Sequence, residues 1–220
     1  MINWDEVFKL ALSRECSRVT YSREWPPEQR RIKGFIIYNV YDPPDVKLED
    51  YTISFTGLVE REVKVSYLDI LTKLPCVDLT ADFHCVTGWS VSNVSWRGVR
   101  VRDIAPKPLT NARYALVIGA DGYTTNIPIN ALMEDTSIVA YAMNGSILSK
   151  DHGFPLRLVI PSRYGWKSAK YVKEVRLIDE AQLGYWEALG YHDNGDPWLE
   201  ERFRDMEGEH KPRRGVKVEK

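Results

Sequence analysis

One cysteine stands in the setting with the clearest chemical potential. Cys85 follows an apolar stretch at residues 77–79 and precedes Gly88. This pattern predicts a strand at residues 77–79 and a thiol beside the turn that comes after it. A thiolate can bind a metal or act as a nucleophile, whereas most free cysteines are small buried hydrophobes. The spacing around Cys85 leaves these alternatives open.

Two of the chemical alternatives have little local support. A zinc site lacks ligands, because no second cysteine lies close to Cys85 and the histidines are scattered along the chain. A cysteine nucleophile would need His152 or His192 as its base, and no local motif pairs either ring with the thiol.

The composition indicates a folded protein without a strong overall charge. The chain has 220 residues, of which 44% are hydrophobic, and this is enough for one core with extensions. The net charge of -1 gives no attraction to nucleic acid or to an anionic membrane. No apolar run reaches the roughly 20 residues of a membrane span, and charges interrupt residues 1–10 where a signal peptide would be apolar. We therefore expect a cytoplasmic protein with no membrane span and no nucleic-acid partner.

The other two cysteines, Cys16 and Cys76, bring the total to three. An odd and sparse set argues against a disulfide framework and is typical of a reducing compartment. We therefore expect both thiols to be buried or incidental.

The elements that would position Cys85 are mainly short strands. Alternating apolar residues predict a hairpin at 51–55 and 63–65, and further β-rich segments at 114–118, 124–128, 138–143, 156–160 and 171–178. Capping patterns predict short helices that begin near Asn3 and Ser66, and residues 129–133 hint at another. Because strands and long helices do not alternate regularly, we predict an α+β fold around a mixed sheet.

Several motifs together resemble the molybdopterin-binding domain of the sulfite oxidase family, which includes the catalytic subunit of periplasmic methionine sulfoxide reductase. The motifs are residues 83–90, 96–99, 120–125, 151–157, 164–170 and 185–187, together with Tyr191. Separate motifs that agree in order and spacing make a specific signal. The chain is most similar to the small stand-alone prokaryotic members. The resemblance implies the mixed-sheet fold of this family and Mo-molybdopterin as the cofactor, in the usual form without a nucleotide.

The resemblance also implies roles for individual residues. Cys85 corresponds to the thiolate ligand of molybdenum, which suits a soft metal bound by sulfur, and Tyr191 to a catalytic tyrosine that faces the metal. The charged and polar groups of the implied cofactor site can hold a phosphorylated pterin. The residues implied to bind the cofactor are Asn39, Asp121, His152, Arg157, Ser168, Ala169 and Lys170. We expect Trp89, Trp96, Trp166 and Trp186 to form cavity walls or core.

The family's pattern suggests three parts in the chain. Residues 1–48 are expected to form an amino-terminal helix and a wrapping arm bracketed by prolines. Residues 49–199 are expected to form the molybdopterin-binding domain, and residues 200–220 a charged, solvated tail. We expect neither the dimerisation domain nor the haem-binding domain that accompanies this unit in the sulfite oxidases.

Two positions depart from the sulfite oxidases. Tyr38 in the arm and Ser90, five residues after Cys85, stand where those enzymes have arginines that attract a doubly charged oxyanion. The substrate is therefore left open between a sulfite-like and a sulfoxide-like molecule.

We predict a molybdenum-pterin oxidoreductase that catalyses two-electron oxygen-atom transfer on a small substrate. Three cysteines are too few for an iron–sulfur cluster, so a separate electron-transfer protein is expected to carry the electrons. The alternative is a non-catalytic or degenerate molybdopterin-binding module, and a β-rich scaffold without cofactor is a third possibility.

Overall fold

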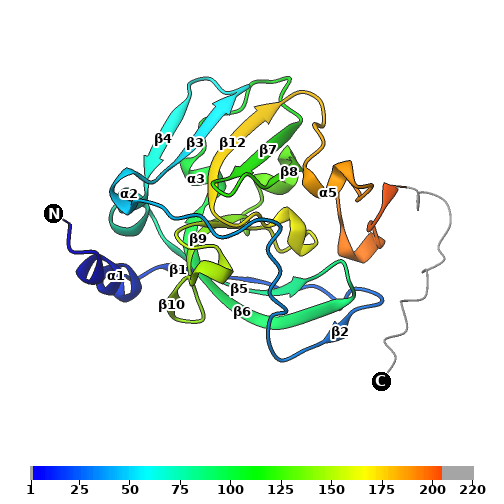
Figure 1. The fold of residues 1–220 in the computed structure, drawn as a ribbon, viewed down its shortest axis with the longest axis horizontal. Helices are drawn as coiled ribbons and strands as arrows, with labels where there is room; N and C mark the ends of the chain where they lie inside the picture. Colours follow the sequence, from blue (N-terminus) through cyan, green and yellow to red (C-terminus); the bar gives the residue numbers. More distant parts are fainter. Residues whose placement is uncertain (1, 205–220) are drawn as a thin grey trace.

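Residues 2–204 are described by the computed structural model, and they fold into two mixed β-sheets (Figure 1). Sheet A has the strand order β1-β5-β6-β9-β10, with β2 beside β6 and β11 beside β9. Its parallel pairs are β1 with β5 and β2 with β6. The strands are β1 (Ser17–Tyr21), β2 (Arg30–Arg31), β5 (Val77–His84), β6 (Trp89–Arg100), β9 (Ile138–Met143), β10 (Ser146–Ile147) and β11 (Arg157–Val159).

Sheet B has five strands in the order β4-β3-β12-β7-β8, and its one parallel pair is β3 with β12. The predicted hairpin is present, because β3 pairs antiparallel with β4. The strands are β3 (Thr52–Gly57), β4 (Val63–Ser66), β7 (Tyr114–Gly119), β8 (Thr124–Pro128) and β12 (Val172–Ile178). The prediction of an α+β fold around mixed sheets is confirmed.

Short helices join and cover the strands. Asn3 caps the first helix by accepting a hydrogen bond from the Glu6 backbone N–H, and Ser66 caps the second in the same way through the N–H of Asp69. The α-helices are α1 (Trp4–Ser13), α2 (Tyr67–Thr72), α3 (Val101–Ile104), α4 (Ile129–Leu132) and α5 (Tyr185–Ala188), and the 3-10 helices are η1 (Leu48–Asp50), η2 (Lys150–His152), η3 (Gly165–Lys167) and η4 (Pro197–Leu199). None of the helices between residues 2 and 204 has the length and apolar composition needed to cross a bilayer.

Two clusters of buried hydrophobic residues form the core. Strand β12 alternates buried Val175 and Leu177 with outward residues, and Phe55 of β3 is fully buried beside them. Burial of each such side chain contributes about 1.5–3 kcal/mol to stability. A second cluster contains Leu79, Val94 and the fully buried Trp96, and lies under the strands that lead to and from Cys85.

The predicted arm crosses the molecule from β2 toward α2 (Figure 1, blue). Phe35 anchors it, since its ring centroid lies 5.1 Å from that of Phe83, 6.2 Å from that of Trp96 and 5.2 Å from that of His152. Farther along, Tyr38 packs against Trp186. The arm therefore contacts sheet A at one end and α5 at the other.

The first residues of the predicted tail pack against the rest of the protein. The ring of Phe203 lies 4.9 Å from that of Tyr191, and Arg204 pairs with Asp193 at 2.7 Å. Residues 200–204 thus depart from the solvated tail that the charge pattern predicts, whereas residues 205–220 lie outside the described part of the chain.

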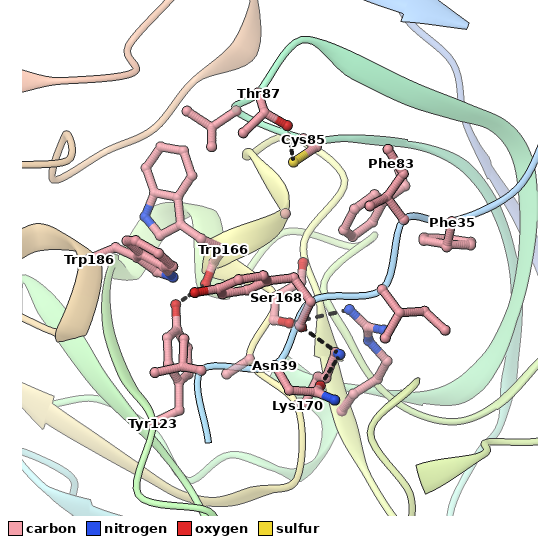
Figure 2. A pocket seen from close by; sticks show the side chains of 18 of the residues that line it. Phe35, Asn39, Phe83, Cys85, Thr87, Tyr123, Trp166, Ser168, Lys170 and Trp186 are labelled. Carbon is pink, nitrogen blue, oxygen red and sulfur yellow. Dashed lines mark hydrogen bonds between the residues drawn. The ribbon is translucent and has the colours of Figure 1, made fainter. Parts of the chain in front are cut away.

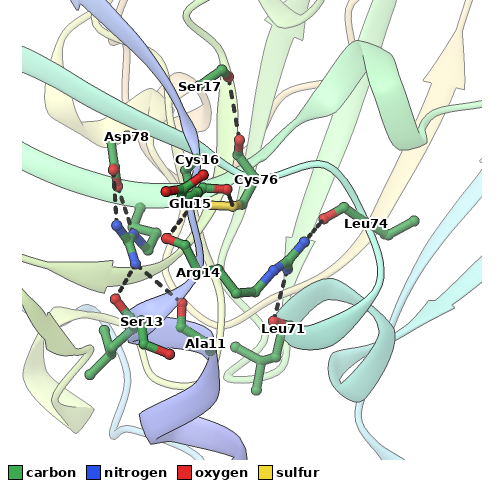
Figure 3. Close-up of a disulfide and its surroundings, with 12 residues drawn as sticks. Ala11, Ser13, Arg14, Glu15, Cys16, Ser17, Leu71, Leu74, Cys76 and Asp78 are labelled. Atoms are coloured by element: carbon green, nitrogen blue, oxygen red, sulfur yellow. Dashed lines mark hydrogen bonds and ion pairs between the residues drawn. A yellow bond between two sulfur atoms is a disulfide. The ribbon is translucent and has the colours of Figure 1, made fainter.

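Cys16 and Cys76 form a disulfide with a sequence separation of 60 residues (Figure 3). The expectation that these cysteines are incidental was therefore wrong. Parallel pairing of β1 with β5 places Ser17 opposite Val77 and brings the preceding cysteines together, a non-local contact that cysteine counting does not detect. Cysteine usage consequently gives no argument for a reducing compartment.

The disulfide should stabilise the fold by restricting the unfolded chain. We expect reduction to lower the free energy of unfolding by about 2–4 kcal/mol, because the bond closes a long loop. Urea denaturation with and without dithiothreitol measures this difference. The Cys16→Ser/Cys76→Ser variant is the control, and an equal effect of reductant on that variant would contradict the assignment.

Candidate functional site

A cavity of about 400 Å³ lies between the arm, the turn after β5, residues 165–170 and the segment after α5 (Figure 2). The structure brings all the sequence-predicted site residues to this one cavity. They are Asn39, Cys85, Asp121, His152, Arg157, Ser168, Ala169, Lys170 and Tyr191. Three of the four tryptophans expected there, Trp89, Trp166 and Trp186, line it as well, and Trp96 lies in the core beside Arg157.

The thiol of Cys85 lies on a tight turn between β5 and β6. The Cys85 backbone N–H donates to the Trp89 carbonyl at 2.8 Å, and the Gly88 N–H returns to the Cys85 carbonyl at 3.0 Å. Gly88 has φ +88°, a conformation that favours glycine. Cys85 is a free cysteine, and its Sγ lies 3.3 Å from the Thr87 hydroxyl (Figure 2). The turn therefore presents the sulfur to the cavity.

Aromatic rings enclose the space beside Cys85. The ring of Tyr191 lies 5.2 Å from that of Trp166 and 4.9 Å from that of Trp186. Burial, and then proximity to Cys85, raises the pKa of Tyr191, so the phenol keeps its proton at neutral pH. This end of the cavity is therefore apolar, with a neutral hydroxyl in its wall.

Arg157 provides a buried cation on the floor of the cavity. Its Nη1 donates to the His152 carbonyl at 3.0 Å and its Nη2 to the Ser168 carbonyl at 3.3 Å, while Nε has no hydrogen-bond partner in the described part of the chain. Its guanidinium lies 4.9 Å from the Trp96 ring. Burial lowers the pKa of Arg157 to about 10, and the group remains charged at neutral pH.

Lys170 lies at the same end of the cavity and ties it to the arm (Figure 2). Its Nζ donates to Asn39 Oδ1 at 2.6 Å and to the Tyr38 carbonyl at 3.0 Å. Burial, and then the charge of Arg157, lowers the pKa of Lys170 to about 8. Two cations that disfavour each other thus lie close together, and no carboxylate of residues 2–204 hydrogen-bonds to either.

The other predicted residues fill the edges of this cationic end. Burial and the same two cations lower the pKa of His152, so its ring is a neutral hydrogen-bonding group at pH 7. Asp121 occupies a turn and accepts from the Tyr123 N–H at 3.1 Å, and burial raises the pKa of its carboxyl. The Ser168 hydroxyl accepts from the Ile160 N–H at 3.1 Å and so serves the backbone.

The residues at this end fit the phosphate of a pterin cofactor. The partnerless Nε of Arg157 is a buried donor that a bound anion would satisfy, and a dianion would also relieve the repulsion between Arg157 and Lys170. At Gly153 an added Cβ would lie 3.0 Å from Arg157 Cβ and 3.1 Å from Lys170 Cβ, so a side chain there would crowd both cations.

A buried ion pair behind the aromatic wall was missed by the sequence analysis. Lys167 Nζ donates to Glu187 Oε1 at 2.6 Å, and both side chains are fully buried. The same oxygen accepts from the Trp166 indole N–H at 3.0 Å, which fixes the ring that faces the cavity. In the sequence, Lys167 and Glu187 each follow a tryptophan, but nothing local indicates that these two residues, 20 positions apart, form a pair.

The comparisons with known proteins agree with this geometry. Residues 40–186 match the family described as "Oxidoreductase molybdopterin binding domain". The chain belongs to this family. Molybdopterin is therefore its cofactor, and the protein is a molybdopterin-dependent oxidoreductase of the sulfite oxidase type.

Its relatives differ widely in length and in named activity. The chain is 39% identical over 181 residues to the "Uncharacterized oxidoreductase YuiH" of Bacillus subtilis, covering 81% of this chain and 91% of that protein. It is 29% identical to the sulfite oxidase of Arabidopsis thaliana, covering 66% of this chain and 46% of that enzyme. It is 28% identical to a putative protein-methionine-sulfoxide reductase subunit of Azospira oryzae, covering 76% and 64%.

A solved structure shares the fold. The sulfane dehydrogenase SoxCD from Paracoccus pantotrophus superimposes with a TM-score of 0.57 at 24% identity. The match covers 63% of this chain and 41% of that one, so this chain corresponds to less than half of the larger protein.

Removal of one member of the buried ion pair should be costly. We expect Glu187→Leu to lower the free energy of unfolding by about 3–5 kcal/mol, because Lys167 is left buried and unpaired. Glu60, which pairs with Lys107 at an exposed site, provides the matched control, and Glu60→Leu should cost less than about 1 kcal/mol. Chemical denaturation of both variants measures the difference, and similar losses would contradict the assignment.

The lowered pKa of Lys170 predicts that the affinity for an anionic cofactor depends on pH. Binding a phosphate raises this pKa from about 8, so binding takes up a proton and weakens as the pH rises above 8. We expect pterin release, followed by fluorescence, to increase between about pH 8 and pH 10 in the wild type. Lys170→Arg keeps its charge and should lose this dependence. Parallel pH profiles for the two proteins would refute the interpretation.

Proposed function

We propose that this protein binds molybdenum through Cys85 and catalyses two-electron oxygen-atom transfer on a small substrate. The main support is the polarity of the cavity, which has a free thiol at one end and, at the other, the buried Arg157 and the half-buried Lys170 (Figure 2). A pterin whose phosphate lies on Arg157 and Lys170 would direct its sulfur atoms toward Cys85. A soft thiolate is a suitable further ligand for a metal already bound by sulfur.

When bound, the molybdenum-pterin group supplies two-electron redox chemistry coupled to exchange of an oxygen atom. The protein supplies binding and orientation. Arg157 and Lys170 hold the phosphate, and Asn39 positions the Lys170 ammonium through a 2.6 Å hydrogen bond. Trp166 and Trp186 exclude water from the reactive end. The neutral phenol of Tyr191 is placed to donate a hydrogen bond to a substrate oxygen without adding charge.

We propose further that the substrate is neutral, such as a sulfoxide, rather than an oxyanion such as sulfite. Tyr38 and Ser90 stand where the sulfite oxidases have arginines, and neither adds charge to the cavity. Ser90 is fully buried and donates to Gln29 Oε1 at 2.8 Å, away from the reactive space. Arg202, near the same turn, donates to the Val86 carbonyl and pairs with Glu200. Within residues 2–204, the cations that line the cavity lie at its pterin end.

A separate protein is proposed to deliver or remove the electrons. The described residues contain no group of three or more His, Cys, Asp or Glu side chains able to hold a further metal ion. Two of the three cysteines form the disulfide, so an iron–sulfur cluster lacks ligands.

We also propose that residues 49–199 form the pterin-binding unit and that residues 1–48 complete it, because residues 35–39 line the cavity.

The function is tested by the metal and pterin content of protein made in a host supplied with molybdate. We expect stoichiometric molybdenum and pterin in the wild type. Cys85→Ser should keep pterin, because Arg157 and Lys170 remain, and should lose both turnover and the thiolate-to-metal absorption band. Wild-type protein without molybdenum or pterin would refute the proposal, and a loaded protein without turnover would favour the non-catalytic module.

Dye-linked assays on the loaded protein decide the substrate class. We expect reduction of a neutral sulfoxide with a reduced viologen, and little oxidation of sulfite with ferricyanide. The matched variant Tyr38→Arg places a cation at an exposed position that lines the cavity, and it should gain sulfite oxidation. Efficient sulfite turnover by the wild type, unchanged in Tyr38→Arg, would contradict the proposed preference.

A further inference from the structure

We propose that Gln29 is a positioning residue that fixes the turn carrying Cys85 and thereby the direction of its sulfur. This inference rests on the proposed role of Cys85 as a metal ligand. Gln29 lies in the amino-terminal segment, 56 residues before Cys85, and is half-buried against the turn.

The Gln29 amide connects the two ends of the turn. Its Nε2 donates to the Cys85 carbonyl at 3.2 Å, and its Oε1 accepts from the Ser90 hydroxyl at 2.8 Å. A carbonyl can only accept, so the contact with Cys85 determines which end of the amide is nitrogen. The oxygen must then face Ser90, whose hydroxyl proton is committed to it.

The same logic assigns the proton on His84. The Ser90 oxygen, having donated its one proton to Gln29, must accept from His84 Nδ1, which lies 2.8 Å away. The hydrogen bonds thus run in one sense from His84 through Ser90 to Gln29, and the Gln29 amide donates in turn to Cys85. Chains of this kind polarise and strengthen their members.

Neighbouring contacts hold Gln29 itself in place. The Trp25 indole N–H donates to the Gln29 carbonyl at 2.7 Å. Next along the chain, the Arg30 N–H donates to the Gly88 carbonyl at 3.0 Å and the Ile32 N–H to the Ser90 carbonyl at 2.9 Å. The amino-terminal segment therefore pairs with the chain next to the turn as a short strand, and the side-chain amide of Gln29 reaches into the turn.

This support comes from outside the family match. The match covers residues 40–186, which include Cys85 and Ser90 but not Gln29. By resemblance, Ser90 stands where the sulfite oxidases have an arginine. Here the small hydroxyl is fully buried, and the Gln29 amide bonds to it directly. At the position where the resemblance implies an arginine, this chain therefore has a buried hydroxyl that contacts Gln29.

A positioning role matters because a metal–sulfur bond needs a defined direction. The turn itself has two backbone hydrogen bonds, and it contains Gly88 at φ +88°, a residue type with few backbone restrictions. Partners behind a metal ligand commonly orient it and tune the metal. Gln29 acts on the carbonyl of the ligand residue itself, so a change at Gln29 is transmitted through few bonds to Sγ.

The test compares full-length wild type with Gln29→Leu, which keeps the approximate size and removes both hydrogen bonds. Cofactor-free protein is treated with iodoacetamide without reductant, so that Cys85 is the thiol outside the disulfide. We expect alkylation to accelerate about fivefold or more, because two hydrogen bonds that close the turn are lost. In molybdenum-loaded protein we expect the EPR g-values of the one-electron-reduced state to shift, with metal still bound.

Two further variants separate positioning from general stability. Gln182→Leu makes the same change at an exposed glutamine and should leave both readouts unchanged. Ser90→Ala removes the partner of Gln29 Oε1 but keeps the bond to Cys85, and should give a smaller change in the same direction. It also serves as the test if Gln29→Leu does not fold.

The outcomes are distinct. A lower unfolding midpoint in Gln29→Leu, with wild-type alkylation and wild-type EPR, would mean that Gln29 only attaches the arm, and the proposal would be overturned. If the wild type binds no molybdenum, the proposed function fails. The alkylation rates then still decide whether Gln29 holds the turn.

Discussion

The structure depends on two neighbouring positive charges, the buried guanidinium of Arg157 and the half-buried ammonium of Lys170, and among residues 2–204 no carboxylate hydrogen-bonds to either. Arg157 is hydrogen-bonded to backbone carbonyls, and Lys170 to a carbonyl and the Asn39 amide. Burying such cations is unfavourable, as their lowered pKa values show. The fold accepts this cost in a chain whose net charge is only -1. A dianionic phosphate bound at the proposed site would offset it, so cofactor binding and the burial of these cations are linked.

Because both cations lie at one end of the cavity, the other end is lined mainly by uncharged aromatic side chains. Around Cys85 the walls are Trp166, Trp186 and the neutral phenol of Tyr191, and these allow an uncharged molecule to approach without competing for the cations. The buried pair of Lys167 and Glu187 stiffens this wall from behind, because one carboxylate oxygen binds both the ammonium and the Trp166 indole. The cations that line the cavity are thus available to a ligand, whereas the buried ion pair has a structural role.

Segments outside the matched family domain complete the site from both ends of the chain. The arm brings Asn39 to Lys170, and Gln29 to the turn of Cys85. After α5, Phe203 packs on Tyr191. The matched domain supplies Cys85, Arg157 and Lys170, whereas Asn39 and Tyr191 come from the flanking segments.

Local patterns determined much of this protein. Motifs along the chain identified the family, the cofactor and all nine candidate site residues, and alternation of apolar residues located most strands. The sequence alone did not reveal strand β6, whose burial pattern alternates only in its middle part and whose pairing shifts register between Arg97 and Gly98. It also did not reveal the Cys16–Cys76 bond, the Lys167–Glu187 pair or the Gln29 contact. Short motifs report which groups are present, because spacing within one element sets their direction. Only tertiary structure decides which distant groups meet, since strand pairing and burial couple residues that lie 20 to 60 positions apart.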